Sequence, residues 1–154
     1  MWFGVVTLFP SMFDALLQHG VTGRAYRDSL FRCRFFNPRD YADNESGYID
    51  DRPFGGGPGM VMLVEPIDRA LQYWRSTFDS TKKSRVLLTS AKGRLFTQKV
   101  AREYTSVDEL AIICGHYEGI DARIEQIIDP IESICIGDFI LTGGELPALI
   151  IMDA

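Results

Sequence analysis

The 154-residue sequence predicts an α/β domain in which helices cover both faces of a parallel sheet. Short, continuously apolar runs such as ELAIIC at 109–114 alternate with segments whose apolar residues recur at helical spacing, as in sheets whose strands are buried on both faces. Three glycine-rich turns, at 55–59, 113–121 and 136–148, stand beside apolar runs and hold nine of the 14 glycines. Ligands of such sheets bind beyond the carboxyl ends of the strands, so these turns are candidates for gripping a flat, nucleoside-like ligand with main-chain groups.

The first third of the chain alternates between the two kinds of element and then loses its periodicity. In order, the sequence predicts a buried strand at 2–9, a short helix opened by Pro10 and ended by Gly20, a helix at 22–30 and a strand at 32–36. Residues 37–59 carry many turn-forming residues, so we expect a long loop there, which in a compact domain is more often functional than idle.

The rest of the chain continues the alternation. A helix beginning at Glu65 is indicated by Pro66 in its first turn and by an apolar stripe that includes Ile67 and Trp74. The elements expected after it are a polar link at 79–84, a strand at 85–90, a glycine turn at Gly93, a helix at 97–104, a strand at 109–114, a turn at 115–119, a helix at 120–129 broken by Asp129 and Pro130, a strand at 131–136, and a helix opening at Glu145.

Length and composition predict a single domain with one sizeable core, since 46% of the residues are hydrophobic. The N-terminal run lacks a basic flank and meets Pro10 early, and no apolar run is long enough for a membrane span, so we expect a cytoplasmic enzyme. Cys33, Cys114 and Cys135 have no C-x-x-C spacing. They predict reduced thiols, with neither disulfide nor zinc.

Charge is distributed unevenly along the chain. The net charge is −5, and residues 101–154 hold eleven acids against two arginines. Residues 23–39 hold one acid, Asp28, and five arginines, namely Arg24, Arg27, Arg32, Arg34 and Arg39. This segment is either a solvated face or a phosphate-binding face, and arginine suits the second because it contacts phosphate with two parallel hydrogen bonds.

Common catalytic motifs are absent from the sequence. It contains no G-x-x-x-x-G-K-[ST], no H-E-x-x-H and no G-x-S-x-G. Gly55, Gly57 and Gly59 spell G-x-G-x-G, but DDRPF precedes them where a dinucleotide-binding loop follows an apolar strand. A P-loop, a metalloprotease site and a serine hydrolase are therefore not indicated.

Four segments in a fixed order carry a resemblance to a known family. TLFPSMF, DDRPFGGGPGM, CGHYEGID and IGDFILTGGELPA together resemble the bacterial tRNA (guanine-N1)-methyltransferase (TrmD) family of the SPOUT superfamily, over essentially residues 1–154. The resemblance implies a C-terminal deep trefoil knot that binds S-adenosylmethionine and an obligate homodimer with its active site at the interface. It also implies methylation of N1 of guanosine 37 in tRNA.

The resemblance also implies roles for particular residues. The cofactor pocket would comprise Leu88, Thr89, Ser90, Gly115, Tyr117, Gly119, Ile136, Gly137, Phe139, Leu141, Gly143 and Gly144. Ile136 and Leu141 are equally compatible with core packing. Glu118 matches a supporting acid near the cofactor and the target base, and the alternative for it is a structural acid. Candidates for RNA contact are Arg24, Asp50, Arg52, Pro58 and Gly59, although Asp50 and Arg52 could instead pair within their own loop.

Some features depart from the family pattern. Leu88, Thr89 and Ala91 stand where Tyr, Leu and Pro are common, and His116 replaces a common Arg. By the resemblance, the general-base aspartate and its partner arginine lie beyond the position of Ala154, so we expect a fragment truncated in its last helix, without the C-terminal tRNA-binding domain. Mg²⁺ is a further expected requirement for activity. The alternatives are another SPOUT RNA methyltransferase, or a cofactor-binding fragment without activity.

Overall fold

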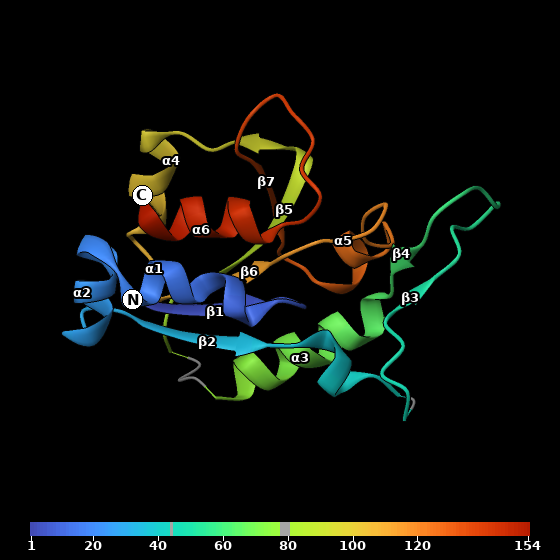
Figure 1. Cartoon of the computed structure of the whole chain (residues 1–154), viewed down its shortest axis with the longest axis horizontal. Helices are drawn as coiled ribbons and strands as arrows, with labels where there is room; N and C mark the ends of the chain where they lie inside the picture. The colour runs from blue at the N-terminus through green and yellow to red at the C-terminus, as the bar shows by residue number, and fades with distance from the viewer. Residues whose placement is uncertain (44, 78–80) are drawn as a thin grey trace.

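A computed structural model describes residues 1–43, 45–77 and 81–154, and its centre is a five-stranded sheet (Figure 1). The strands are β1 (Trp2–Val6), β2 (Arg32–Phe36), β5 (Ser84–Leu95), β6 (Glu109–Ile113) and β7 (Glu132–Cys135). Their order is β2-β1-β6-β5-β7, and every pairing between neighbours is parallel. The predicted parallel sheet is therefore confirmed.

Helices cover both faces of this sheet, as predicted. Successive side chains of a strand point to opposite faces, so Ala111 and Ile113 of β6 pack in one core cluster and Leu110 and Ile112 in another. The first cluster lies under α3 (Val64–Ser76) and α5 (Ile124–Ile127). The second lies under η1 (Pro10–Phe13), α1 (Asp14–Gln18), α4 (Gln98–Tyr104) and α6 (Glu145–Asp153). The stripe predicted for α3 is confirmed, since Ile67 and Trp74 are buried.

Several predicted boundaries are wrong. The strand expected at 2–9 ends at Val6, and the helix expected from Pro10 is divided into η1 and α1. Gly20 does not end a helix, because it takes a φ of +65° and begins α2 (Gly20–Arg27). The helix expected over 120–129 is only the single turn of α5. Residues 78–80, which include part of the expected polar link, lie outside the described residues.

The segment expected to be a long loop, 37–59, contains two short elements, and a third follows it closely. Asn37 caps η2 (Pro38–Tyr41) by accepting a hydrogen bond from the Arg39 N–H, and β3 (Asp50–Asp51) pairs antiparallel with β4 (Val61–Met62). The first glycine turn forms the tip of this hairpin, which projects from the body of the molecule (Figure 1). Gly55, Gly56, Gly57 and Gly59 all have positive φ there, so glycine is required by the turn itself.

The expected glycine turn at Gly93 is also wrong, because β5 continues through it to Leu95. Thr89 and Arg94 both pair with Ile134 of β7, so residues 90–93 form a bulge between two paired stretches. A Cβ on Gly93 would overlap the backbone of β7, lying 2.6 Å from the Ile134 carbonyl carbon. Gly93 is needed here because the backbones of β5 and β7 approach too closely for a side chain. The sequence alone does not distinguish such a glycine from one that forms a turn.

Candidate functional site

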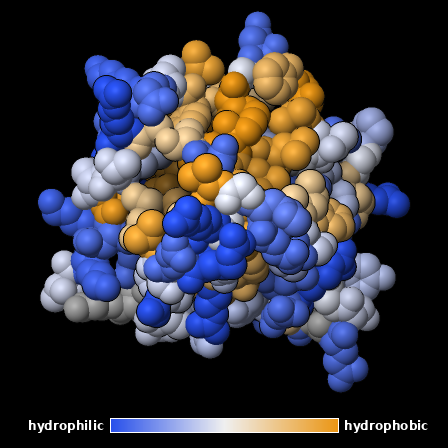
Figure 2. Space-filling view, turned by 60° about the vertical axis from the view of Figure 1, so that its left-hand side comes forward, coloured by the Kyte–Doolittle hydropathy of each residue, from blue (hydrophilic) through white to orange (hydrophobic). Residues whose placement is uncertain are grey.

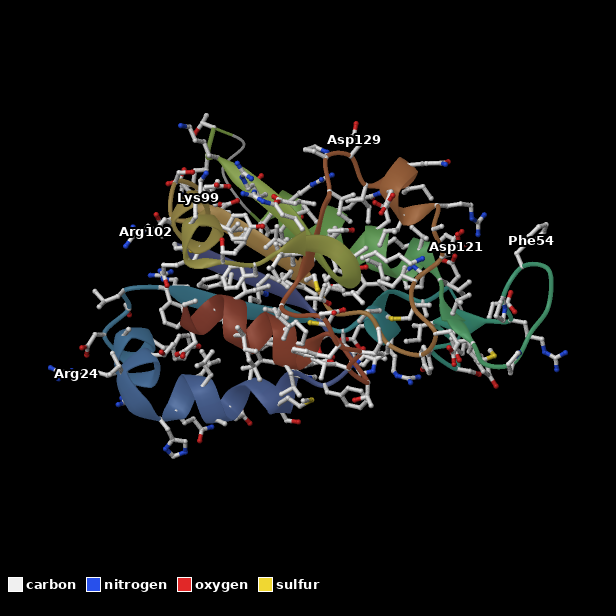
Figure 3. All side chains as sticks on the ribbon, turned by 90° about the horizontal axis from the view of Figure 1, so that it is seen from above. Arg24, Phe54, Lys99, Arg102, Asp121 and Asp129 are labelled. Carbon is white, nitrogen blue, oxygen red and sulfur yellow. The ribbon has the colours of Figure 1, made fainter. Side chains whose placement is uncertain are left out.

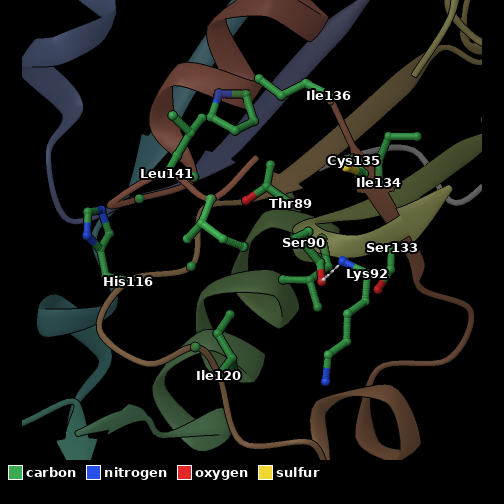
Figure 4. Close-up of a pocket in the computed structure, with 18 of the residues that line it drawn as sticks. Thr89, Ser90, Lys92, His116, Ile120, Ser133, Ile134, Cys135, Ile136 and Leu141 are labelled. Atoms are coloured by element: carbon green, nitrogen blue, oxygen red, sulfur yellow. Dashed lines mark hydrogen bonds between the residues drawn. The ribbon is translucent and has the colours of Figure 1, made fainter. Parts of the chain in front are cut away.

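A cavity of about 610 Å³ lies beyond the carboxyl ends of β6 and β7, against the middle of β5 (Figure 4). Its walls come from three stretches of chain, within residues 88–92, 115–125 and 133–147. The volume falls within the range of roughly 300–1,000 Å³ for small-molecule sites. The cavity therefore lies where the strand order and the glycine turns predict a ligand site.

All twelve residues expected to bind the cofactor line this one cavity: Leu88, Thr89, Ser90, Gly115, Tyr117, Gly119, Ile136, Gly137, Phe139, Leu141, Gly143 and Gly144. Leu141 is not a core residue, because its side chain is exposed, and Ile136 is half-buried. That these residues contact a cofactor stays a prediction. Their convergence on one hollow shows that the second and third glycine turns form a single site.

The first wall is the bulge of β5. Residues 90–93 have no counterparts on β7, so Ser90 and Lys92 reach the rim of the cavity (Figure 4). The Ser90 hydroxyl accepts a hydrogen bond from the Lys92 N–H at 3.3 Å. Lys92 was missed by the sequence analysis. Its position directly after an apolar strand was the signal that could have identified this cation.

The second and third glycine turns are locked together by backbone contact. The Gly144 N–H donates to the Gly115 carbonyl at 2.9 Å, and the Thr89 hydroxyl donates to the Ile113 carbonyl at 3.0 Å. A Cβ on Gly144 would overlap Thr89 Oγ1 and lie 2.6 Å from Cys114 Cα. Glycine is needed at 144 because the turns meet at a distance that excludes a side chain.

A buried polar cluster supports the same junction. The Glu145 side chain, 1% exposed, accepts from the Thr7 hydroxyl at 2.6 Å through Oε1, and its Oε2 lies 2.6 Å from His116 Nε2. The His116 ring also packs edge-to-face with Phe9, with centroids 5.0 Å apart. Burial and the charge of Glu145 both raise the pKa of the neighbouring Cys114 thiol. Sequence reasoning missed this cluster because Thr7 follows β1, His116 lies in the turn after β6 and Glu145 begins α6, and no local pattern links them.

The hairpin lies against the second glycine turn. Met62 N–H donates to the Gly119 carbonyl at 2.9 Å, and Glu118 N–H donates to the Met60 carbonyl at 3.0 Å. A Cβ on Gly59 would lie 2.5 Å from Cγ of Glu118, so this glycine packs directly on the acid. Glu118 is exposed and lines the cavity. Two of the expected target-side residues are thus in contact within one chain.

The remaining RNA candidates do not form one surface. Asp50, Arg52 and Pro58 belong to the hairpin, where the Asp51 carboxylate accepts from the Arg52 N–H at 2.7 Å. Arg24 lies on α2, near the opposite end of the molecule from the hairpin residue Phe54 (Figure 3). There it makes a solvent-exposed ion pair with Asp28 at 3.6 Å. Within a single chain, Arg24 and the hairpin cannot contact the same nucleotide.

The described residues form neither a metal-ligating group nor a disulfide. In the described parts of the chain no group of three or more His, Cys, Asp or Glu residues could hold a metal ion. Cys33, Cys114 and Cys135 are free thiols, and burial raises the pKa of Cys33 to about 12. Among the described residues no helix has the length and apolarity needed to cross a membrane.

Fold and cavity together define the class of protein: a parallel α/β domain with a ligand cavity beyond its strand ends. The model of the tRNA (guanine-1)-methyltransferase TrmD family matches residues 1–154, and the chain belongs to this family.

Curated relatives and a solved structure agree with that membership. A tRNA (guanine-N(1)-)-methyltransferase of Neisseria meningitidis serogroup C is 47% identical over 150 residues, which cover 97% of this chain and 59% of the relative. Its counterpart from Nitrosomonas europaea is 46% identical over 155 residues, covering 99% of this chain and 57% of the relative. The crystal structure of tRNA (m1G37) methyltransferase from Aquifex aeolicus matches with a TM-score of 0.86 at 35% identity, covering 99% of this chain and 67% of that one. The chain therefore spans less than two thirds of the length of these curated relatives.

Proposed function

We propose that this chain is the S-adenosylmethionine-binding part of an enzyme that methylates N1 of guanosine 37 in tRNA. The observation that carries the proposal is the single cavity shared by the second and third glycine turns, in a chain of the TrmD family. The relatives' names support guanine N1 as the target, and the name of the Aquifex aeolicus protein supports position 37. These names also favour this reaction over that of another SPOUT RNA methyltransferase.

The residues of the cavity fit a nucleoside-bearing cofactor. Gly115, Gly143 and Gly144 lack side chains where the chain borders the hollow, so a flat ligand can lie against main-chain atoms. Leu88 and Leu141 add apolar surface, and the main-chain groups of 136–141 supply hydrogen-bonding partners for a purine edge. When bound, S-adenosylmethionine supplies an electrophilic methyl group on sulfur. The chain's part is to hold the donor in place and keep water from it.

Glu118 and the hairpin are proposed to form the guanine side of the site. N1 of neutral guanine carries a proton, and a carboxylate beside the base accepts hydrogen bonds from guanine N–H groups. Glu118 has the position for this, because it lines the cavity and packs on Gly59 of the hairpin. Arg52 and Pro58 on the same hairpin would lie near the flipped nucleotide, and Arg24 would contact tRNA elsewhere. The base that removes the N1 proton is not assigned to a residue of this chain.

A homodimer is proposed from the exposed apolar surface. Phe9 and Met12 near η1, and Leu146 and Ile150 on α6, are exposed, as are Phe139, Ile140 and Leu141 beside the cavity. Figure 2 shows apolar side chains gathered on one face of the molecule. An uncovered face of this kind is typical of a protein interface. A second copy would cover it and enclose the cavity, in line with an active site at the interface.

Four further features belong to the same proposal. They are a deep trefoil knot in the C-terminal part, a single catalytic domain over residues 1–154, a cytoplasmic location where the tRNA substrate is found, and Mg²⁺ dependence of activity. Since no metal-ligating group of three occurs in the described part of the chain, Mg²⁺ would depend on oxygen atoms of the RNA or the cofactor for most of its ligands.

Calorimetric titration with S-adenosylmethionine and with its amine analogue sinefungin tests the cofactor site. We expect stoichiometric binding of both, and a folded chain that binds neither would contradict the proposal. Methyl transfer is then measured with a protein of the relatives' full length on two tRNA transcripts that differ only in having G or A at position 37. Methylation of the G37 transcript alone is expected, and equal methylation of both would exclude the proposed target.

A further inference from the structure

The cavity has an acceptor that neither the family match nor the glycine turns assign. His116 lines the cavity and stands at its left side in Figure 4. The side chain is 16% exposed, so it is neither a free surface group nor a fully buried one. Its two ring nitrogens lie in different surroundings, and that difference decides what the ring can offer a ligand.

Nε2 is bound to the protein. It lies 2.6 Å from Oε2 of Glu145, whose Oε1 accepts from Thr7. Thr7 Oγ1 in turn accepts from the Phe9 N–H at 3.0 Å, so its single proton is committed to Glu145. The backbone of Gly143 packs against the same ring, so closely that a Cβ at this position would lie 2.7 Å from Nε2. The ring therefore has little freedom to rotate or flip.

Glu145 determines which nitrogen carries the proton. It is the first residue of α6, and its Oε1 already accepts from the Thr7 hydroxyl. An ionised carboxylate only accepts hydrogen bonds, so Nε2 must donate to it. In the neutral ring the proton then resides on Nε2 and the lone pair on Nδ1.

Nδ1 is the ring nitrogen that the protein leaves for a ligand. Among the described residues it has no hydrogen-bond partner, and it belongs to a partly exposed ring that lines the cavity. We propose that Glu145 and Thr7 hold His116 in the Nε2–H tautomer, so that Nδ1 accepts a hydrogen bond from an amine or hydroxyl donor of the nucleoside ligand in the cavity. This inference rests on the proposed cofactor site. It makes His116 a ligand-contacting residue, and Glu145 and Thr7 positioning residues.

Two substitutions separate this role from simple packing. In His116→Gln the amide can still donate to Glu145, but the acceptor at the Nδ1 position is lost. In Glu145→Gln the amide donates to Nε2, which forces the proton onto Nδ1 and turns the acceptor into a donor. Both variants keep the buried hydrogen bond. We expect each to bind sinefungin about 5- to 50-fold more weakly than the parent chain, with melting temperatures within a few degrees of the parent.

The two losses should not add in the double variant, because both substitutions remove the same acceptor. His19→Gln is the matched control, since the only other histidine is exposed at the junction of α1 and α2, and its affinity should be unchanged. ¹⁵N-resolved NMR of the two histidines gives a readout independent of the variants. For His116 it should show a proton on Nε2 alone at pH 7.5, and a changed Nδ1 resonance with sinefungin.

Unchanged affinity in folded His116→Gln and Glu145→Gln would overturn the inference, as would an Nδ1–H tautomer or a doubly protonated ring. A parent chain that does not bind sinefungin would instead contradict the cofactor site itself, and the inference would fail with it. The two failures are distinguished by the parent chain, which binds sinefungin in the first case and does not bind it in the second.

Discussion

Replacing Gly144 by alanine tests whether the two glycine turns must meet as closely as they do. Gly144 has φ −84° and ψ −5°, which alanine adopts without strain, so the substitution acts through contact alone. The new Cβ would overlap Thr89 Oγ1 and lie 2.6 Å from Cys114 Cα, where carbon atoms normally stay about 3.5–4.0 Å apart. Thr89 can rotate only by giving up its bond to Ile113, and a backbone Cα cannot rotate at all.

The magnitude follows from these contacts. Overpacking costs about 1–3 kcal/mol, and stretching the bond from Gly144 N–H to Gly115 costs about 1 kcal/mol. Alanine also lowers the conformational entropy of the unfolded chain relative to glycine, and this stabilises the folded state by about 0.4–1 kcal/mol. We expect a net loss of about 1–3.5 kcal/mol in the free energy of unfolding. In a chain of this length that corresponds to a melting temperature lowered by about 2–14 °C.

Thermal and urea denaturation followed by circular dichroism measure the loss, with Gly137→Ala as the matched control. A Cβ on Gly137 would overlap the Phe139 ring, but that ring is 54% exposed and can swing into solvent. The control should therefore stay within about 0.5 kcal/mol of the parent. A Gly144→Ala chain as stable as the parent would refute the reasoning that these turns meet too closely for a side chain.

Three further outcomes are expected. Glu118→Gln keeps the packing of this side chain but removes its charge. In the full-length enzyme, methyl transfer to tRNA should therefore fall at least about tenfold, while sinefungin affinity changes less than twofold. Unchanged turnover would mean that Glu118 has only a structural role. Iodoacetamide at pH 8 should label Cys135, which lines the cavity, and sinefungin should protect it. Cys33 should react slowly, because its pKa is raised to about 12 and only about one molecule in ten thousand carries it as the thiolate at this pH. Ile150→Glu places a charge on the exposed apolar side of α6 and should shift the chain toward monomer in sedimentation velocity; an unchanged dimer would locate the interface elsewhere.

Local pattern was sufficient for the elements whose packing follows from periodicity. The apolar stripe of α3, the helical segment that forms α4 and the apolar run of β6 are all features of neighbouring residues, and each element begins within one residue of its predicted start. Local pattern failed where a residue's role depends on a distant partner. Gly93 was predicted to be a turn because its close neighbour, Ile134 of β7, is forty-one positions away along the chain.

The candidate site divides in the same way. The glycine turns and their positions after apolar strands predicted where the cavity lies, because the carboxyl ends of parallel strands share one edge of the sheet. The twelve lining residues were predicted from the resemblance to the family, and all of them line the cavity. Only the tertiary structure joined His116 to Glu145 and Thr7, and only it separated Arg24 from the hairpin. Sequence indicates which elements form and in what order, whereas contacts between elements depend on how the chain packs. The composition of the cavity could therefore be predicted from sequence, but the hydrogen bonds that hold its walls together could not.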